Sequence, residues 1–505
     1  MSLAGLDVGT TGCKAAVFNP EGKLLALAYR EYPLIHPQPG LSEHDVEMVW
    51  SKVREVLREV NAQVKRDPIK ALSISCHGEA VVPVAKDGSH LYNFVITFDD
   101  RTIPQYRRWM EEVGAWRVFE LTGMPLHPMY SINKIMWFKE NRPDIYERAW
   151  KFLCVEDFFN YKLGGEAVID YSLAARTMAF DVRRLAWSEE ILSLAGVDEA
   201  LLARPAPSGT VVGQVSRQIA RELDFSSPVA IVTGGHDQPC GALGAGIIKE
   251  GIAMNATGTS DVVCPAFQAP ILSKAMLEGN YPCYPHTFPG MYVTIAFNLT
   301  GGLLLRWYRD TLCAEERQEA ERTGRDVYDI IIERASPEPA NIFILPHFVG
   351  SGTPSLDPTS RGAILGLTLD TTKADLSRAV LDSTDYEMKL NLETMKRIGI
   401  RIEELRAIGG GAKSPFWLQL KADTFGLPVV ALKVSEAAGL GTAILAGAAI
   451  GEFEGIRQGV EATFRPGQVY EPDPAQNARY EARYRRFVEI YPLLRRFNRS
   501  LSEGF

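Results

Sequence analysis

Short apolar runs alternate with polar turns over the first 32 residues of the chain. The runs at 3–8, 13–18 and 23–32 are separated by Gly-Thr-Thr-Gly at 9–12 and Asn-Pro-Glu-Gly at 19–22. Apolar runs of this length, bounded by turns rich in glycine and asparagine, are typical of β-strands joined by tight hairpins. The pattern therefore predicts a three-stranded meander at the N-terminus.

Helical spacing of the apolar positions appears after this meander. The spacing predicts a helix at 46–66 and then a buried strand at 69–75. Further apolar segments and helices are predicted later in the chain, at 291–299, 342–348, 363–369, 373–397, 413–425 and 436–451. The tail at 476–499 has Arg, Glu and Tyr at helical spacing, which predicts an amphipathic closing helix with a solvated basic end. Because strands and helices alternate, the predicted fold class is α/β.

A second strand–turn–strand pattern begins near residue 250. Residues 251–257 and 261–266 are predicted strands, with Gly258-Thr259-Ser260 as the turn between them. The segment Gly-Leu-Asp-Val-Gly-Thr-Thr at 5–11 has the same shape, an apolar strand followed by a tight Gly-Thr hairpin. The repetition predicts two similar lobes that join near 245–252.

Composition narrows the class of protein. Hydrophobic residues make up 46% of the 505 residues and charged residues 23%, as in folded soluble proteins. The formal charge of −8 argues against a dedicated nucleic-acid surface. The chain has no uninterrupted apolar run of about 18 residues, and its N-terminus lacks the basic segment of a signal peptide, so we expect no membrane partner and no secretion.

Seven cysteines are scattered along the chain without a C-x-x-C pair. An odd number at irregular spacing argues against a disulfide framework and against a zinc site. Reduced, buried thiols in the cytoplasm are the simplest interpretation.

Asp7, which precedes the Gly-Thr-Thr-Gly hairpin at 9–12, is the first candidate for chemistry. Such a hairpin can direct backbone N–H groups and the hydroxyls of Thr10 and Thr11 toward a phosphate. Asp7 would then stand where a Mg²⁺ held by phosphates needs an oxygen ligand. The alternative is a plain hairpin whose aspartate only caps the turn.

Gly258-Thr259-Ser260 repeats this device in the second lobe. Two such hairpins that face each other across a cleft would clamp a triphosphate from both sides. By itself the short turn is more often an ordinary hairpin, so the interpretation depends on its counterpart at 9–12.

Asp237 belongs to Gly-Gly-His-Asp-Gln at 234–238, which follows the apolar strand at 229–232. An acid at a strand-to-helix turn can cap the helix or face a cleft. Phosphoryl transfer needs positioning, charge neutralisation and a base that accepts the hydroxyl proton. Asp237 is the candidate for that base, and a simple helix cap is the alternative.

Gly-Gly-Gly-Ala-Lys-Ser-Pro at 409–415 follows an apolar run and opens a predicted helix. Glycines at this place let a flat nucleobase or a phosphate lie against the main chain. Glycine-rich strand-to-helix turns are common, so a purely structural turn is the alternative.

Two polar clusters follow predicted strands of the first lobe. In Ser-Cys-His-Gly-Glu at 75–79, His77 and Glu79 could hydrogen-bond sugar hydroxyls, although a lone histidine is more often structural. Asp99-Asp100-Arg101 is either a substrate acid with its arginine or a surface ion pair.

Together these residues resemble the FGGY carbohydrate kinases over essentially the whole chain. One family signature is matched at 129–141 by Met-Tyr-Ser-Ile-Asn-Lys-Ile-Met-Trp-Phe-Lys-Glu-Asn. The other is matched by Gly-Ala-Ile-Leu-Gly-Leu at 362–367, Asp-Leu at 375–376 and Ala-Val-Leu-Asp at 379–382. Family-like blocks also stand at Asp170-Tyr171-Ser172, Arg176-Thr177 and Gly-Leu-Gly-Thr-Ala, 439–443.

The resemblance implies a two-lobed actin/hexokinase/Hsp70-like (ribonuclease H-like) ATPase fold, with the active site in the interlobe cleft. Its parts would be an N-terminal lobe at 1–248 for sugar, Mg²⁺ and phosphates, a C-terminal lobe at 249–475 for ATP, and a closing helix at 476–505. The implied cofactors are ATP and Mg²⁺, and the implied partner is a small sugar or polyol. Dimers are common in the family, so a homodimer is compatible with the resemblance, although no segment marks an interface.

The resemblance also assigns site residues. Asp237 matches the catalytic aspartate of the family, and Asp7 with Asp237 would hold Mg²⁺, partly through water. The ATP-binding positions would be Thr10, Thr11, Gly258, Thr259, Gly301, Gly302, Gly410, Gly411, Ala412 and Ser414. The sugar-binding positions would be His77, Gly78, Glu79, Asp100, His236, Asp237 and Gln238.

The identity of the sugar stays open at this point. His77-Gly78 resembles the Met-His-Gly segment of xylulokinases and gluconokinases, with Cys76 in place of the methionine, whereas Asp237-Gln238 resembles the Asp-Gln of glycerol kinases. We expect a pentulose such as xylulose first; another ketose, gluconate, glycerol or a tetritol is the alternative.

Two other classes of protein use the same fold. A sugar- or nucleotide-binding regulator that has lost catalysis would lack Asp237 or the Gly-Thr-Thr hairpin, and both are intact here. A chaperone-like ATPase would carry a further peptide-binding domain after residue 475.

Overall fold

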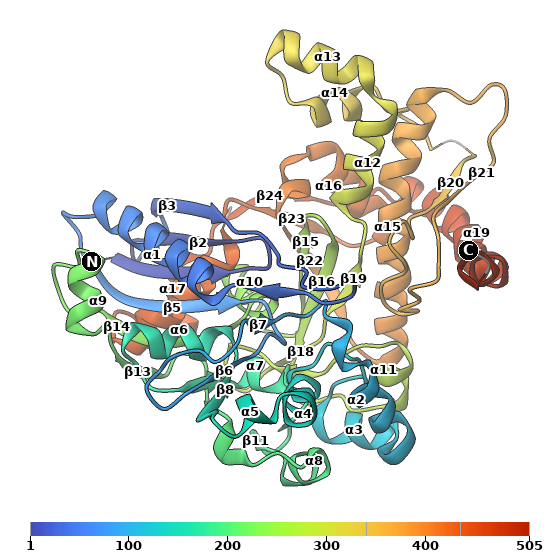
Figure 1. The fold of residues 1–505 in the computed structure, drawn as a ribbon. Helices are drawn as coiled ribbons and strands as arrows, with labels where there is room; N and C mark the ends of the chain where they lie inside the picture. The colour runs from blue at the N-terminus through green and yellow to red at the C-terminus, as the bar shows by residue number, and fades with distance from the viewer. Residues whose placement is uncertain (1, 340, 435, 504–505) are drawn as a thin grey trace.

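The computed structural model describes residues 2–339, 341–434 and 436–503. Two β-sheets with helices packed around them form the molecule, and the chain ends on the far side from its start (Figure 1). Residues 504 and 505, the end of the predicted closing segment, lie outside the described residues.

The first sheet has six strands in the order β13-β14-β5-β1-β2-β3. The predicted N-terminal meander is confirmed: β1 (Ser2–Val8), β2 (Gly12–Phe18) and β3 (Leu24–Glu31) run antiparallel. Next to β1, the strands β5 (Ile69–Cys76) and β14 (Ala230–His236) run parallel to it. The other edge is β13 (Val211–Gln214), and α1 (Val46–Gln63) packs against β2 and β3.

The second sheet repeats this arrangement, in the order β17-β18-β16-β15-β22-β23-β24 with β19 beside β16. A tight antiparallel hairpin, β15 (Gly251–Thr257) and β16 (Asp261–Phe267), is again followed by a parallel neighbour, β22 (Ile402–Ile408). The other strands are β17 (Tyr284–Pro285), β18 (Tyr292–Val293), β19 (Ala296–Asn298), β23 (Val429–Leu432) and β24 (Pro466–Tyr470). The two similar lobes predicted from the repeated hairpin are therefore present.

The register of the parallel strands decides where the motifs meet. In the first sheet Val8, Cys76 and His236 are aligned, so the segments that follow β1, β5 and β14 leave the sheet at one edge. In the second sheet Ala256 is aligned with Ile408, which brings the turns at 258–260 and 409–413 to one edge as well. Parallel strands collect their C-terminal loops in this way, and this edge is where α/β proteins place their sites.

Helix α17 (Ala437–Ala449) belongs to the first lobe in space, although it follows the second sheet in sequence. It packs against β1, β5 and α10 (Asp237–Gly244). The approach is so close that a Cβ on Gly5 would lie 2.1 Å from the backbone oxygen of Gly439, and one on Gly441 would lie 2.0 Å from that of Cys240. The chain therefore crosses between the lobes three times: into the second lobe after α10, back to the first for α17, and to the second again for β24. The predicted limits at 248 and 475 instead assign 249–475 to the C-terminal lobe as one segment.

The helices predicted near 373–397 and 413–425 are α15 (Lys373–Ile398) and α16 (Pro415–Phe425). The second starts two residues later than predicted, because Ser414 caps it by accepting a hydrogen bond from the backbone of Trp417 (3.3 Å). The predicted closing helix is α19 (Pro474–Glu503). Within the part of the chain that the structure describes, no helix has the length and apolar character to cross a membrane.

The smaller elements complete the lobes. The short strands are β4 (Glu43–His44), β6 (Val82–Val84), β7 (Phe94–Val95), β8 (Lys151–Leu153), β9 (Val168–Asp170), β10 (Phe180–Asp181), β11 (Ala186–Trp187), β12 (Arg204–Ala206), β20 (Phe343–Leu345) and β21 (Ala363–Leu365). The helices of the first lobe are α2 (Ile103–Arg108), α3 (Ala115–Thr122), α4 (Ser131–Asn141), α5 (Pro143–Tyr146), α6 (Val155–Leu163), α7 (Tyr171–Ala175), α8 (Glu189–Ala195) and α9 (Arg217–Glu222). The second lobe adds α11 (Lys274–Glu278), α12 (Gly302–Leu312), α13 (Ala314–Thr323) and α14 (Val327–Glu333), whereas α18 (Ile456–Thr463) packs beside α17 on the first lobe. Figure 1 shows α13 and α14 standing away from both sheets.

Candidate active site

Asp237 is the first residue of α10, at the point where β14 ends. Its carboxylate is 36% exposed, and its Oδ1 forms no hydrogen bond with the described residues. Desolvation among protein atoms, and then the negative charges of Asp7 and Glu79, raise the pKa of Asp237 to about 7. A carboxylate with this pKa can accept a proton near neutral pH and release it again.

Asp7 lies near the end of β1, one strand away. Its Oδ1 accepts a hydrogen bond from the Ser75 hydroxyl (2.9 Å), and burial raises its pKa. Asp7 is also among the groups that raise the pKa of Asp237, so the two carboxylates interact electrostatically. The structure thus brings together the two acids that the sequence proposed separately.

His236 orients the neighbourhood of Asp237. Its Nδ1 is 3.1 Å from the Tyr284 hydroxyl and its Nε2 is 3.2 Å from Oδ1 of Asp237. Burial lowers the pKa of His236 to about 3, with a further contribution from Arg176, so the ring is neutral. Which of the two ring nitrogens carries the proton decides whether Tyr284 donates to Nδ1 or accepts from it. Tyr284 belongs to β17 of the second sheet, so this contact joins the two lobes at the site.

Two further predicted sugar-binding side chains present free polar atoms. His77 is held by a contact between its Nδ1 and the backbone oxygen of Val8 (3.0 Å), and its buried Nε2 has no partner among the described residues. The Oε1 atom of Gln238 is likewise buried without a partner there. Buried polar atoms of this kind need a hydrogen bond, which a bound molecule with hydroxyl groups can supply.

Glu79 forms a buried ion pair with Arg176, and their side chains are 4% and 5% exposed. Although burial opposes its charge, Arg176 lowers the pKa of Glu79, and Glu79 in turn raises that of Arg176. The hydroxyl of Thr97 donates to the other carboxylate oxygen of Glu79 (3.1 Å), while the buried ammonium of Lys134 donates to its backbone oxygen (2.7 Å). Glu79 also has a left-handed backbone, with φ of 66°. The site therefore contains a fixed, internally neutralised pair.

The segment after β7 is not the surface ion pair that was one of its two sequence-based interpretations. Arg101 pairs with Asp99 (2.6 Å) and Glu43 (2.7 Å), and all three side chains are buried, so this is not a surface ion pair. Asp100 is exposed, and its backbone N–H donates to Gly40 (2.8 Å). Asp99 and Asp100 are adjacent in this turn, but the Asp99 side chain is buried and Asp100 is exposed. Its role in sugar binding stays a prediction.

A cavity of about 420 Å³ lies at the corresponding edge of the second sheet. Six of the ten predicted ATP-binding residues line it: Gly258, Thr259, Gly302, Gly410, Gly411 and Ser414. The hairpin is fastened to the start of α12 by two backbone hydrogen bonds, from Gly302 to Gly258 (2.7 Å) and from Leu303 to Thr259 (3.1 Å). A Cβ at Gly302 would lie 2.5 Å from the Gly258 oxygen, which explains the glycine.

The other four predicted ATP-binding residues do not line this cavity. Gly301 caps α12 and Ala412 packs against the core of the second lobe. Thr10 and Thr11 are in the first hairpin, where the Gly9 N–H donates to Gly12 (2.9 Å) and Nε2 of His44 contacts the backbone oxygen of Thr10 (2.9 Å). Their roles toward a nucleotide stay predictions.

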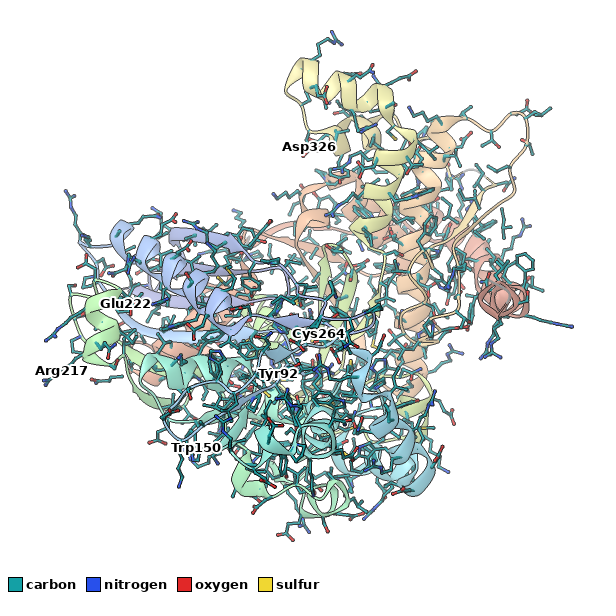
Figure 2. The ribbon with its side chains drawn as sticks, viewed as in Figure 1. Tyr92, Trp150, Arg217, Glu222, Cys264 and Asp326 are labelled. Carbon is teal, nitrogen blue, oxygen red and sulfur yellow. The ribbon has the colours of Figure 1, made fainter. Side chains whose placement is uncertain are left out.

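Several residues at the two sites had no counterpart in the sequence-based assignment. Arg306, Asp326, Tyr328 and Trp417 line the cavity, and Arg176 and Tyr284 contact the residues around Asp237. Figure 2 marks Asp326 at the start of α14, above the second sheet, and Cys264 of β16 in the middle of the molecule. Arg176 stood in a family-like block without a role; the cavity residues come from helices whose only sequence signal is amphipathic spacing.

A magnesium ion carried by nucleotide phosphates needs few protein oxygens. Across residues 2–339, 341–434 and 436–503, no three histidine, cysteine or acidic side chains gather as a metal cluster. Asp7 and Asp237 nevertheless fit such an ion, because both are carboxylates at one edge and their mutual repulsion leaves negative charge uncompensated.

Comparison with known families identifies the class of protein that this fold and site define. The model of the N-terminal domain of the FGGY family of carbohydrate kinases matches residues 2–244, and the model of its C-terminal domain matches residues 253–450. The chain belongs to this family. Family membership makes it a phosphotransferase that acts on a carbohydrate hydroxyl with ATP and Mg²⁺.

Two relatives and one solved structure show which kinases this chain is similar to. A xylulose kinase of Staphylococcus epidermidis is 29% identical over 493 residues, covering 97% of this chain and 96% of the relative. A glycerol kinase of Symbiobacterium thermophilum is 31% identical and covers 89% of this chain and 90% of its own length. The crystal structure of a ligand-bound xylulose kinase from Lactobacillus acidophilus has a TM-score of 0.89 at 24% identity, covering 98% of each chain, which confirms the predicted fold.

Proposed function

We propose that this kinase phosphorylates a terminal hydroxyl of a neutral open-chain ketose, a pentulose such as xylulose, with Asp237 as the base. The observation that carries the proposal is the carboxylate of Asp237, whose Oδ1 has no hydrogen bond among the described residues and whose pKa is raised to about 7. The likeness to a xylulose kinase supports the pentulose.

The chain's own residues account for the proton and for the position of the sugar. Asp237 takes the proton of the attacking hydroxyl as that oxygen bonds to the γ-phosphorus and the bond to the β–γ bridging oxygen breaks, which releases ADP. Nε2 of His236 lies 3.2 Å from the carboxylate without forming a hydrogen bond to it, so Oδ1 stays open to the sugar hydroxyl. His77 and Gln238 each offer a buried, unpartnered atom to further hydroxyls of the sugar.

The nucleotide binds along the glycine-lined cavity of the second lobe, between the hairpin at 258–260 and the turn at 409–413. Backbone amides there suit phosphates because they donate hydrogen bonds without filling the space. When bound, Mg²⁺ neutralises phosphate charge, and Asp7 and Asp237 are the residues that would hold it, partly through water.

The charge of the sugar site favours a neutral substrate over an acidic one such as gluconate. Two cations lie in the cluster around Glu79: Arg176, which Glu79 already neutralises, and Lys134, whose ammonium already donates to the backbone oxygens of Glu79 and Met129. A substrate carboxylate would therefore meet the negative charges of Glu79, Asp237 and Asp7 without a free partner. Taking an unpaired charge out of water into such a place is strongly unfavourable.

A coupled ADP-release assay tests the proposal with a panel of xylulose, glycerol, erythritol and gluconate. We expect xylulose to give the highest kcat/KM and gluconate the lowest. A preference for gluconate would show that the argument from charge is wrong. ADP release that no sugar stimulates would contradict the assignment of an open-chain sugar as acceptor.

The base is tested in the same assay by Asp237→Ala, with Asp144→Ala as a control, since Asp144 is an exposed aspartate of the same lobe. General-base catalysis contributes about 10²- to 10⁴-fold, so we expect kcat to fall by that factor in Asp237→Ala only. Turnover near the wild-type value would rule out Asp237 as the base.

The remaining expectations are part of this proposal. All seven cysteines are buried and free, which agrees with reduced thiols. The cytoplasmic location, the homodimer, and the lack of nucleic-acid and membrane partners stay predictions.

A further inference from the structure

Three charged side chains are buried directly beneath the hairpin at 258–260: Asp261, Asp385 and Lys421, which we call the Lys421 cluster. The Lys421 side chain is 1% exposed and those of both aspartates 0%. Its Nζ lies 2.7 Å from Oδ2 of Asp261 and 3.4 Å from Oδ1 of Asp385. The three residues come from β16, α15 and α16, so the cluster ties together three separate elements.

Asp261 connects the cluster to the hairpin. It is the first residue of β16 and is paired with Thr257, the last residue of β15. Its Oδ1 accepts hydrogen bonds from the Thr257 hydroxyl (2.9 Å) and from the Asn255 amide (2.7 Å). One carboxylate therefore fixes both ends of the turn that carries Gly258 and Thr259.

Asp385 connects the cluster to the opposite wall of the nucleotide cavity. Its Oδ1 accepts a hydrogen bond from Nε1 of Trp417 (3.2 Å), and Trp417 lines the cavity together with Thr257. Trp417 and Lys421 are four residues apart on α16, so they share one face of the helix. The hairpin and the tryptophan wall are thus held to the same ammonium group.

A buried ion cluster adds little stability to a core, because apolar side chains of similar volume are often at least as stabilising. Burial opposes the charge of Lys421, but Asp261 and Asp385 raise its pKa, so the ammonium stays charged. What a charged cluster adds over apolar packing is a fixed direction for each hydrogen bond. Here the two hydrogen bonds that Oδ1 of Asp261 accepts come from Thr257 and Asn255, at the base of the hairpin.

We propose that Lys421 is a positioning residue for the nucleotide: through Asp261 and Asp385 it sets the spacing between the hairpin at 257–261 and the Trp417 wall. It touches neither substrate nor the reacting atoms. The proposal rests on the nucleotide site described under the proposed function. It predicts that loss of the cluster weakens nucleotide binding while sugar binding, at the edge of the other sheet, is unchanged.

The test compares Lys421→Met with Lys389→Met by calorimetric titration with ADP and with the preferred sugar. Lys389 is a matched control: its side chain is 4% exposed, it pairs with Glu481 (3.1 Å) and donates to the Thr424 oxygen (2.8 Å), and it does not line the cavity. Both variants should lose thermal stability. Only Lys421→Met should bind ADP about tenfold more weakly, since a small displacement of several hydrogen-bond donors costs on the order of 1.4 kcal/mol.

A second variant separates positioning from a general loss of stability. Asp261→Asn keeps the acceptor for Thr257 and Asn255 but weakens the hold of Lys421, so it should reduce ADP affinity in the same direction, and it replaces Lys421→Met if that variant does not fold. The double variant with Lys421→Met and Asp261→Asn should bind ADP no more weakly than Lys421→Met alone, because both changes break the same interaction between Lys421 and Asp261.

These measurements test the positioning role of Lys421 and the nucleotide site separately. If Lys421→Met and Lys389→Met weaken ADP binding equally, or if neither does, the positioning role is refuted. If the unchanged protein binds sugar but no ADP, the nucleotide site itself is wrong, and this proposal falls with it.

Discussion

The two candidate sites of this kinase are built in opposite ways from the same strand–hairpin–strand plan. Around Asp237 the first sheet presents ionised and polar side chains, including the buried pair of Glu79 and Arg176. At the equivalent edge of the second sheet the cavity includes four glycines, at 258, 302, 410 and 411, whose backbone is open to it, beside side chains such as Arg306 and Trp417. Side chains suit a small substrate whose hydroxyls must be told apart, whereas backbone amides suit phosphates that every nucleotide shares.

This difference predicts different responses to mutation. The first site should be sensitive to changes of charge, and the second to changes of shape. Three experiments can break or sharpen the comparison.

The largest expected effect is on stability, at the buried pair. Arg176→Met leaves the Glu79 carboxylate buried without its partner, which typically lowers the free energy of unfolding by about 3–5 kcal/mol. Glu79→Gln in addition should restore part of this loss. Urea denaturation measures both variants, with Arg142→Met as the control, since Arg142 and Asp144 form an exposed pair (39% and 60%) expected to contribute about 0–1 kcal/mol. Equal effects at the two pairs would contradict the importance of burial here.

An intermediate effect is expected from shape at the second site. Gly302→Ala puts a Cβ within 2.5 Å of the Gly258 oxygen, so the hairpin must move. We expect the KM for ATP to rise about tenfold, corresponding to about 1.4 kcal/mol, with the KM for sugar unchanged. Gly455→Ala is the matched control, because no atom lies within 4 Å of its Cβ position. A change in the sugar KM instead would mean that the two sites are not separable.

The smallest effect concerns pH. The pKa of Asp237 is raised to about 7 from an ordinary value of 3.8, chiefly by burial and then by Asp7 and Glu79. Below pH 7 the base of the free enzyme becomes protonated, so log kcat/KM should fall with a slope of about one per pH unit. A pH–rate profile that stays flat down to pH 5 would show that another group accepts the proton.

The raised pKa of Asp237 also makes the stability of the folded protein depend on pH. Between the ordinary pKa and about 7 the folded state binds more protons at Asp237 than the unfolded state does, so this group makes stability decrease as pH rises through that window. Asp237→Asn should therefore be more stable than the wild type at pH 8, and the difference should shrink toward pH 4. Thermal unfolding at both pH values measures it.

The local pattern of the sequence determined most of the secondary structure at the site. Alternating apolar runs and Gly-Thr turns located both hairpins, and Gly-Gly-His-Asp-Gln placed Asp237 at the junction of β14 and α10. Strand periodicity and turn chemistry act over a few residues, so they can be read without knowing the fold.

Only the tertiary structure decided which charges are neutralised and which are left free. Glu79 is separated from Arg176 by 97 residues and Asp261 from Lys421 by 160. The residues around each of these side chains do not indicate which partner it has. The same holds for α17, which lies between two strands of the second sheet in sequence but packs against the first sheet. Ion pairs and helix packing depend on distances through space, and those are set by how the two sheets and their crossing helices pack, not by the spacing of residues along the chain.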